Sequence, residues 1–326
     1  MKECDCFWTH SALRTLATKL RKKCGLALLF ILPVFASAEG AHAPGLGMWV
    51  WPQEAFETTN ARKKLLKFCG QEGISHLDQH ISFANTENTL TVKNQDALVS
   101  LVTTAGKQGI TVNVLRGSKD MFFRGNHKKT LEELRAIISF DENLPSGTHL
   151  AGVKYDVEPY GTAEWKAGGG SRRKVIIDYL TFLQEAKRLL KREAPHLNLA
   201  VDVPFWWDDE KFSVRFNGVD KLLIEHVQDL TDYICIMSYR TNAKEVLECI
   251  RHEQTYAGRI GKTICAGLET GNVKGAESWI SFRSHPKAVF RKTVSELQQK
   301  LSGDQTVRSI MLHHYNSLFS YLKNEE

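Results

Sequence analysis

From residue 46 onward, short apolar runs alternate with longer segments whose apolar positions recur every three or four residues. The short runs predict β-strands and the longer segments predict amphipathic helices. The eight predicted strands are residues 46–51, 74–78, 110–115, 150–156, 197–203, 233–237, 263–267 and 309–313. The predicted helices are residues 56–71, 94–107, 128–140, 172–193, 218–229, 242–256, 286–301 and a short one from residue 316.

This alternation is typical of βαβ units around a parallel sheet. Eight units in about 280 residues match the count and size of a closed (β/α)₈ TIM barrel, a parallel eight-stranded barrel with outer helices. A doubly wound open sheet is the alternative, and it usually has a glycine-rich turn after its first strand. Here Trp51-Pro52 ends the first strand. The sequence therefore favours one barrel domain over residues 39–326.

The first 38 residues have the order of a secretory signal peptide. A cationic stretch, Lys19–Lys23, precedes an apolar run, Leu26–Phe35, and the small-residue site Ala36-Ser37-Ala38. This order predicts cleavage after Ala38 and a periplasmic or secreted protein. The apolar run is short for a bilayer span, so an uncleaved anchor is the lesser alternative and we expect no stable membrane insertion after cleavage.

Composition changes this picture little. The chain has 326 residues, 42% hydrophobic and 25% charged, as in ordinary soluble proteins. Its formal charge is +6, and much of the excess lies in the first 23 residues. Basic runs such as Arg172-Arg173-Lys174 fall on predicted helices and indicate solvated helix faces, so we expect no nucleic-acid partner. The four cysteines beyond residue 38 match no zinc spacing, so we expect no metal and no cofactor, while a disulfide stays open.

The predicted strands end in polar residues, which matters because catalytic groups of such barrels come from the carboxyl ends of the strands. Seven of the eight strands end in this way. We therefore expect a substrate-binding site at this end of the barrel. Its expected members are Asp78, His80, Arg116, Asp202, Met237, Arg240, His313 and His314.

Asp156 and Glu158 are the strongest candidate pair. Residues two apart in a strand point to the same side, so both carboxyl groups should face the barrel axis together. Two neighbouring carboxyl groups separate in pKa, which leaves a protonated acid beside an ionised partner. Cleavage of a glycosidic bond by general acid catalysis needs such an acid.

Aromatic residues near the strand ends support a carbohydrate substrate, because aromatic faces stack on sugar rings. Trp206 and Trp207 are followed by Asp208-Asp209, which favours exposure of both rings. Trp49 and Trp51 are further substrate-binding candidates, although packing at the top of the barrel would also explain them.

The segment Gly152-Val-Lys-Tyr-Asp-Val-Glu158 resembles the fourth-strand signature of the chitinase-like glycoside hydrolases (family 18), Asp-Gly-x-Asp-x-Asp-x-Glu. Met237-Ser-Tyr239 is similar to that family's Met-x-Tyr on the sixth strand. The resemblance implies that Glu158 is the general acid, that Asp156 orients an N-acetyl group of the substrate, and that Tyr239 assists there.

The chain also departs from that pattern, so we expect a divergent chitinase-like barrel. Lys154 replaces the inner aspartate, and Arg240 stands where an aspartate often follows the tyrosine. Lys154 should face Asp156 and keep its carboxyl group ionised.

Three alternatives remain open. In a retaining scheme Glu158 would be the acid and Glu269 on the seventh strand the nucleophile. In a metal-dependent hydrolase, ligands would come from Asp78, His80, Asp156, Glu158 and His313 or His314. The third alternative is a barrel that binds sugars without cleaving them.

Overall fold

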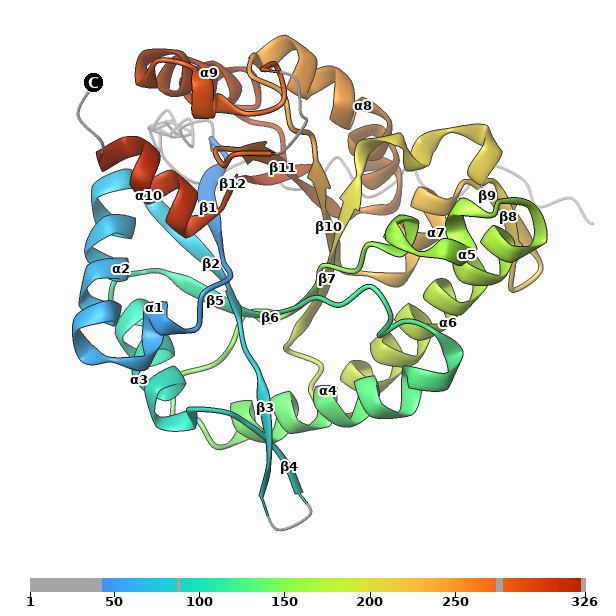
Figure 1. The fold of residues 1–326 in the computed structure, drawn as a ribbon, viewed down its shortest axis with the longest axis horizontal. Helices are drawn as coiled ribbons and strands as arrows, with labels where there is room; N and C mark the ends of the chain where they lie inside the picture. Colours follow the sequence, from blue (N-terminus) through green and yellow to red (C-terminus); the bar gives the residue numbers. More distant parts are fainter. Residues whose placement is uncertain (1–42, 87–88, 274–277, 324–326) are drawn as a thin grey trace, which may run out of the picture. The chain divides into compact units, whose positions relative to one another are not determined.

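The computed structural model describes residues 43–86, 89–273 and 278–323, so the predicted signal peptide, 1–38, lies outside the described residues. Eight parallel strands close into a barrel in the order β1-β12-β11-β10-β7-β6-β5-β2 (Figure 1). This confirms the predicted (β/α)₈ fold. The strands are β1 (Gly45–Val50), β2 (Ile74–His80), β5 (Thr111–Arg116), β6 (Gly152–Tyr155), β7 (Asn198–Pro204), β10 (Tyr233–Met237), β11 (Thr263–Glu269) and β12 (Val307–His313).

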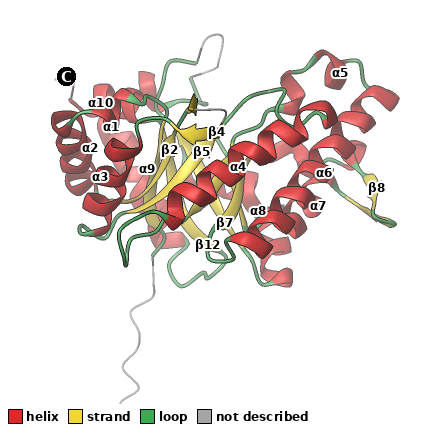
Figure 2. Cartoon of the chain, turned by 90° about the horizontal axis from the view of Figure 1, so that it is seen from below, coloured by secondary structure: helices red, strands yellow, loops and turns green. Residues whose placement is uncertain are grey.

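Helices surround the barrel, and Figure 2 shows the strands enclosed between them. They are α1 (Glu54–Glu57), α2 (Thr59–Glu72), α3 (Gln95–Gly106), α4 (His127–Glu142), α5 (Ala163–Lys166), α6 (Gly169–Glu193), α7 (Leu223–Leu230), α8 (Ala243–Ile260), α9 (Lys287–Lys300) and α10 (Tyr315–Lys323). The helix predicted over residues 56–71 is broken at Thr58, whose side chain caps α2 by accepting a hydrogen bond from the Ala61 backbone N–H.

Strand periodicity separates two buried regions. Alternate residues point into the barrel, where Trp49, Leu115, Tyr233, Cys235 and Met311 belong to one apolar cluster. The other face of each strand packs under the helices in a larger apolar core. The barrel is therefore filled by side chains, and polar groups inside it need partners there.

Two hairpins interrupt the simple alternation. β3 (Phe83–Thr86) pairs with β4 (Thr89–Val92), and β8 (Val214–Phe216) pairs with β9 (Val219–Lys221). The helix predicted over residues 218–229 is therefore wrong at its start, because residues 219–221 form β9 and α7 begins at Leu223. In addition, the segment after β6 contains the short helix α5, and α6 begins at Gly169, before the predicted helix start at residue 172.

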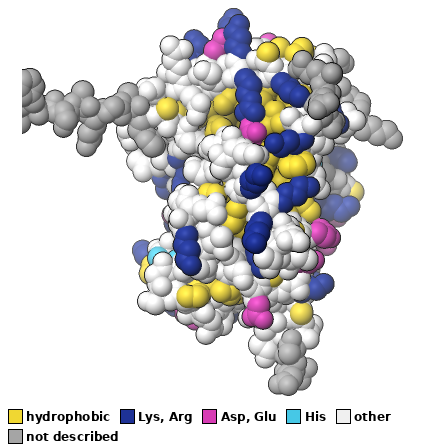
Figure 3. All heavy atoms as spheres, turned by 90° about the vertical axis from the view of Figure 1, so that its left-hand side faces the viewer, with side chains coloured by type: hydrophobic (Ala, Val, Ile, Leu, Met, Phe, Trp, Pro, Cys, Tyr) yellow, Lys and Arg dark blue, Asp and Glu magenta, His cyan; other side chains and the backbone are white. Residues whose placement is uncertain are grey.

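Basic side chains are spread over the face that carries α2, with apolar side chains between them (Figure 3). Among the described residues, no helix combines the length and the apolarity needed to cross a membrane. Cys69, Cys235, Cys249 and Cys265 are free thiols, which answers the open question of a disulfide among them.

Candidate active site

The candidate acids follow directly from β6. Lys154 is fully buried inside the barrel, whereas Tyr155 packs outward against Phe182 of α6 with ring centroids 5.0 Å apart. The backbone N–H of Asp156 still donates to the Arg116 carbonyl at 2.7 Å, as in a continuing parallel ladder. Strand alternation therefore carries past the end of β6 and turns Asp156 to the same side as Lys154.

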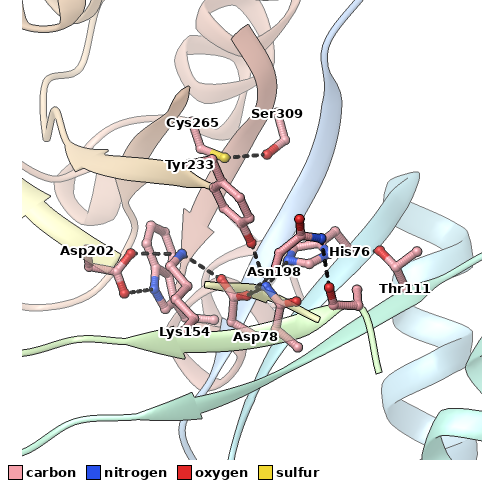
Figure 4. Close-up of polar contacts among 12 residues, drawn as sticks. His76, Asp78, Thr111, Lys154, Asn198, Asp202, Tyr233, Cys265 and Ser309 are labelled. Carbon is pink, nitrogen blue, oxygen red and sulfur yellow. Dashed lines mark hydrogen bonds and ion pairs between the residues drawn. The ribbon is translucent and has the colours of Figure 1, made fainter. Parts of the chain in front are cut away.

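A buried ion cluster lies beneath Asp156. The Lys154 Nζ is 2.7 Å from Asp78 Oδ2 and 2.7 Å from Asp202 Oδ1 (Figure 4). Trp49 donates from Nε1 to Asp202 Oδ2 at 3.0 Å, and its ring lies 4.4 Å from the same ammonium. One cation thus faces two carboxylates in a region without solvent.

Asp78 has further partners on the side away from Lys154. Asn113 donates to Asp78 Oδ1 at 2.9 Å. His76 Nε2 lies 2.9 Å from the same oxygen (Figure 4). Burial raises the pKa of Asp78, but the charges and hydrogen bonds of Lys154 and His76 outweigh it and hold that pKa well below its usual range. Asp78 is therefore ionised and fully engaged, as a buried charge must be.

The structure corrects the expected roles of three residues. Asp78 and Asp202 are 0% and 1% exposed, so they hold Lys154 inside the barrel and do not form a substrate surface. Arg116 points outward, where it donates to the Ile81 carbonyl at 2.6 Å and to Glu133 of α4 at 2.9 Å. In the sequence, the position of Arg116 at a strand end does not show on which side of the strand its side chain lies.

Asp156 also differs from expectation, because Lys154 does not keep it ionised. Burial and the charges of Asp202 and Glu158 raise the pKa of Asp156 well above its usual range, although Lys154 acts in the opposite direction. The ammonium is already paired with two carboxylates, and burial raises the pKa of Asp202 itself to about 6. A third negative charge here is unfavourable, which favours the protonated form of Asp156.

Glu158 lies two residues further on and is exposed. Its Oε1 accepts a hydrogen bond from the Tyr160 hydroxyl at 2.5 Å. Burial and the charge of Glu158 raise the pKa of Tyr160, so this hydroxyl remains a donor. The chain thus places a half-buried carboxyl group with a raised pKa two residues before an exposed carboxyl group.

Tyr239 joins the site from the residues after β10. A Cβ on Gly267 would come within 3.3 Å of the Tyr239 ring and 3.2 Å of the Trp49 ring, so this glycine leaves room for both. Burial and the charges of Glu269, Asp156 and Asp202 raise the pKa of Tyr239 well above its usual range. Tyr239 is therefore a neutral hydroxyl group among the acids.

Glu269, His313 and Trp51 form a hydrogen-bonded chain. Glu269 Oε2 lies 2.7 Å from His313 Nδ1, and Trp51 Nε1 donates to His313 Nε2 at 3.2 Å. Glu269 Oε1 accepts from the Gly271 backbone N–H at 2.6 Å. Burial raises the pKa of Glu269, but the hydrogen bonds with His313 and the Gly271 N–H lower it below its usual range. Both oxygens are engaged, which suits a residue that orients His313.

We call Trp51, Asp156, Glu158, Tyr239, Glu269 and His313 the mouth cluster. Its parts adjoin one another: the Tyr239 and His313 ring centroids are 5.8 Å apart, and a Cβ on Gly117 would touch both the Trp51 ring and the Asp156 carbonyl oxygen. His80 stacks obliquely near Trp51, with centroids 5.5 Å apart. Met237 and His314 are half-buried beside this cluster, and substrate binding by these residues stays a prediction.

The two neighbouring tryptophans have different environments. Trp207 is 0% exposed and packs against Trp165 and Tyr179, so its expected exposure was wrong. Trp206 is half-buried, and its ring centroid lies 5.4 Å from that of Tyr160. Of these two tryptophans, only Trp206 can therefore present an accessible ring edge or face near Glu158.

Sequence reasoning missed Trp279, which is 44% exposed in the segment after β11. The Arg240 guanidinium lies 4.5 Å from the Trp279 ring and 4.7 Å from the Phe205 ring. Arg240 also donates to the Tyr239 carbonyl at 2.8 Å. The position of an isolated tryptophan within a long loop gave no signal of this arrangement.

The metal alternative finds no support at the mouth. Within the described residues, the grouping of three potential ligand side chains within 4.8 Å of one another is Asp141, His149 and His196, none of which belongs to the mouth cluster. Asp78 is already bound to Lys154 and His76. The six residues proposed as alternative ligands therefore do not converge on one ion.

Comparison with known proteins identifies the fold of the chain. The activity has to be inferred from the site itself. No protein-family model and no curated protein matches the chain. A chitinase from Bacteroides thetaiotaomicron is similar in structure, with a TM-score of 0.52 at 16% identity over 86% of this chain and 94% of that chain. The family 1 β-glucosidase from Thermotoga maritima gives 0.55 at 9% identity, covering 83% and 88%. An exo-β-1,4-mannosidase from Opitutaceae bacterium strain TAV5 gives 0.56 at 11% identity, covering 84% and 52%. The chain therefore has the barrel fold of chitinases and other glycosidases.

Proposed function

We propose that this protein is a glycoside hydrolase that cleaves an O-glycosidic bond by carboxyl general acid catalysis. The observation that carries the proposal is the pairing of Asp156, a half-buried carboxyl group with a raised pKa, with the exposed Glu158 just beyond the carboxyl end of β6. Glycosidic cleavage requires a proton at the leaving oxygen and an ionised group near the sugar ring. The mouth cluster supplies both kinds of group.

In the proposed reaction Glu158 protonates the leaving oxygen. In the free enzyme the raised pKa of Asp156 favours its protonated form, because a third charge beside Asp78 and Asp202 is unfavourable. On substrate binding the proton of Asp156 moves to Glu158, which is the proposed general acid. Asp156, then ionised, faces the developing positive charge on the sugar or orients a substrate amide. A water molecule then bonds to the anomeric carbon in place of the leaving group and returns one proton to the carboxyl groups, so the starting state is restored. Tyr239 donates a hydrogen bond from its neutral hydroxyl group.

The substrate proposed is a polysaccharide or oligosaccharide. Support comes from the rings of Trp51, Trp206 and Tyr160 near the acids, since aromatic faces bind the apolar faces of sugars. The likeness of the fold to a chitinase, a β-glucosidase and a mannosidase agrees with this class of substrate. The resemblance of residues 152–158 to the chitinase-like signature makes sugars with an N-acetyl group the first to test.

The experiment is hydrolysis of a panel of chromogenic glycosides and oligosaccharides, with and without N-acetyl groups. We expect Glu158→Gln to lower kcat about 10²- to 10⁴-fold, the scale of a lost general acid. Glu164→Gln, an exposed acid on α5, is the matched control and should retain activity. Absence of product from any substrate with wild-type protein, combined with intact binding, would favour a barrel that only binds sugars.

The same panel tests the retaining scheme with Glu269 as nucleophile. Because both Glu269 oxygens accept hydrogen bonds, we expect Glu269→Gln to lower the rate while leaving measurable turnover. Complete loss of activity, with recovery on addition of azide as an external nucleophile, would instead assign the nucleophile to Glu269.

We also propose that the protein is exported to the periplasm or secreted. The support is the order of charged, apolar and small residues in positions 19–38. Sequencing of the mature protein from the extracytoplasmic fraction should give Glu39 as the first residue.

A further inference from the structure

Three segments far apart in the sequence meet at the end of the barrel opposite the mouth cluster. Asp141 lies in the last turn of α4, His149 in the loop before β6, and His196 between α6 and β7. These loops precede their strands, so they lie at the amino-terminal ends of β6 and β7. The His149 and His196 ring centroids are 5.2 Å apart.

Asp141 is the fixed member of this group. Its side chain is 1% exposed, and its Oδ1 accepts the Leu150 backbone N–H at 2.6 Å. The other oxygen, Oδ2, lies 2.7 Å from His196 Nε2 and 3.6 Å from His149 Nδ1. A buried carboxylate is thus held by the backbone with one oxygen directed at two imidazole nitrogens.

The spacing of the three atoms matches a metal ion. His149 Nδ1, His196 Nε2 and Asp141 Oδ2 all lie within 4.8 Å of one another. Zinc bonds of about 2.0–2.2 Å at tetrahedral angles separate neighbouring ligand atoms by about 3.2–3.6 Å. The distance between His149 Nδ1 and Asp141 Oδ2, 3.6 Å, already has this value. The His196 nitrogen would withdraw by less than about 1 Å, which an imidazole that is 46% exposed can do.

The ligand types select the ion. Two imidazoles and one carboxylate suit zinc and similar transition ions, whereas calcium and magnesium prefer oxygen ligands alone. His149 is 61% exposed, so solvent can reach the site and supply a water as the fourth ligand. The Leu150 N–H on Asp141 supplies the orienting contact that metal-binding carboxylates usually have.

We propose that Asp141, His149 and His196 bind a zinc ion that joins the loop before β6 to the turn before β7. Because these residues are ligands only in the folded chain, the ion stabilises the native state by mass action. The site is separate from the mouth cluster and independent of the proposed function.

The test is calorimetric titration of the full mature chain with zinc chloride, together with thermal unfolding with and without zinc. We expect one zinc ion per chain, a melting temperature raised by a few degrees, and no shift with magnesium. His149→Ala, His196→Ala and Asp141→Asn should each weaken zinc binding at least about tenfold. His252→Ala removes a histidine that lies 3.7 Å from Glu225 on another part of the surface, and it should bind zinc like the wild type.

Failure of wild-type protein to bind zinc would overturn the proposal, as would equal affinity in the three ligand variants. His149→Ala guards against misfolding as an explanation, because this side chain is the most exposed of the three. Its melting temperature without zinc should equal that of the wild type without zinc. If a variant of His313 abolished binding and the three ligand variants did not, the ion would belong to the mouth cluster and the assignment here would be wrong.

Discussion

At the scale of single residues, the chemistry of the mouth depends on how one cation is shared. Lys154 pairs with Asp78 and Asp202, and these two carboxylates compensate most of its positive charge. Lys154 therefore does little to stabilise the ionised form of Asp156. The replacement of an inner aspartate by lysine, seen in the sequence, therefore does not remove the proton from Asp156. Burial and the neighbouring acids retain it.

The raised pKa of Asp156 predicts that the free energy of unfolding depends on pH in a way that the Asp156→Asn variant lacks. An unfolded aspartate titrates near pH 3.9, whereas folded Asp156 binds its proton more tightly, so the folded state binds more protons between these pKa values. Stability contributed by Asp156 therefore falls as pH rises from about 4 toward the folded pKa. Asp156→Asn removes this titration, and its stability relative to wild type should rise between pH 4.5 and pH 7. Urea unfolding at both pH values measures this. A relative stability that falls with pH would contradict the raised pKa.

Removal of the Lys154 ammonium should have the opposite effect, so that the stability of the variant relative to wild type falls as pH rises. Lys154→Met leaves Asp78 and Asp202 buried without a counter-charge, which we expect to cost about 3–5 kcal/mol of unfolding free energy at pH 7. In the wild type the pKa of Asp78 is lowered, so its contribution is present above about pH 4 and is lost as pH falls through the folded pKa. The deficit of the variant should therefore shrink in acid, as both carboxyl groups take up protons.

The matched control is Lys174→Met. Lys174 is 73% exposed and pairs with Asp178 four residues along α6. Such a pair contributes at most about 0.5 kcal/mol. A Lys154→Met variant no less stable than Lys174→Met would show that the buried cluster is dispensable for folding.

At the scale of elements, the segments after β6 and β7 build an aromatic layer beside the acids. Tyr160 follows β6 and Trp206 follows β7, and their rings meet with centroids 5.4 Å apart. Tyr160 also donates to Glu158. Figure 1 shows α5 and the β8–β9 hairpin, both within these segments, on the same side of the barrel. The acid is thus connected to a layer suited to hold a sugar.

On the proposed function, Trp206→Ala should weaken substrate binding. Loss of one stacking ring corresponds to about 1.4 kcal/mol, or a roughly tenfold higher KM, with kcat changed much less. Trp207→Ala is the structural contrast, because that ring is fully buried and its loss should cost about 3–5 kcal/mol of stability. Steady-state kinetics and urea unfolding of both variants separate the two roles. An unchanged KM in Trp206→Ala would remove this residue from the site.

The elements themselves were predictable to the extent that periodicity defines them. All eight barrel strands were predicted within two residues at their starts and ends. The polar residues that end β2 and β11, His80 and Glu269, masked the last two residues of these strands. The two hairpins were missed because strands of three or four residues show too little alternation. Strand-end position alone could not separate Arg116, which points outward, from Asp156, which points inward.

At the scale of the whole molecule, barrel closure brings together groups that no local pattern connects. His313 on the last strand bonds Trp51 after the first, 262 positions away, and Asp141 meets His196 across 55 positions. Spacing along the chain gave no sign of either contact. The candidate acids could be found because both directly follow one strand, β6, whereas their partners depend on which strands become neighbours.

Closure itself can be tested at Gly47, where β1 pairs with β12. A Cβ at Gly47 would overlap the Met311 sulfur and come within 3.3 Å of His76. We expect Gly47→Ala to destabilise the protein by about 1–3 kcal/mol through overpacking. Met311→Ala should cost about 2–5 kcal/mol because it leaves a cavity.

In the double variant the added methyl group occupies part of that cavity, so its loss of stability should be smaller than the sum of the two single losses. Gly70→Ala on α2 is the control, because nothing lies within 4 Å of its added Cβ and helix propensity should slightly favour alanine. Urea unfolding of the four variants measures the coupling. Strict additivity would mean that the first and last strands do not meet at Gly47 and Met311, and the closed barrel on which the mouth cluster depends would then need another register.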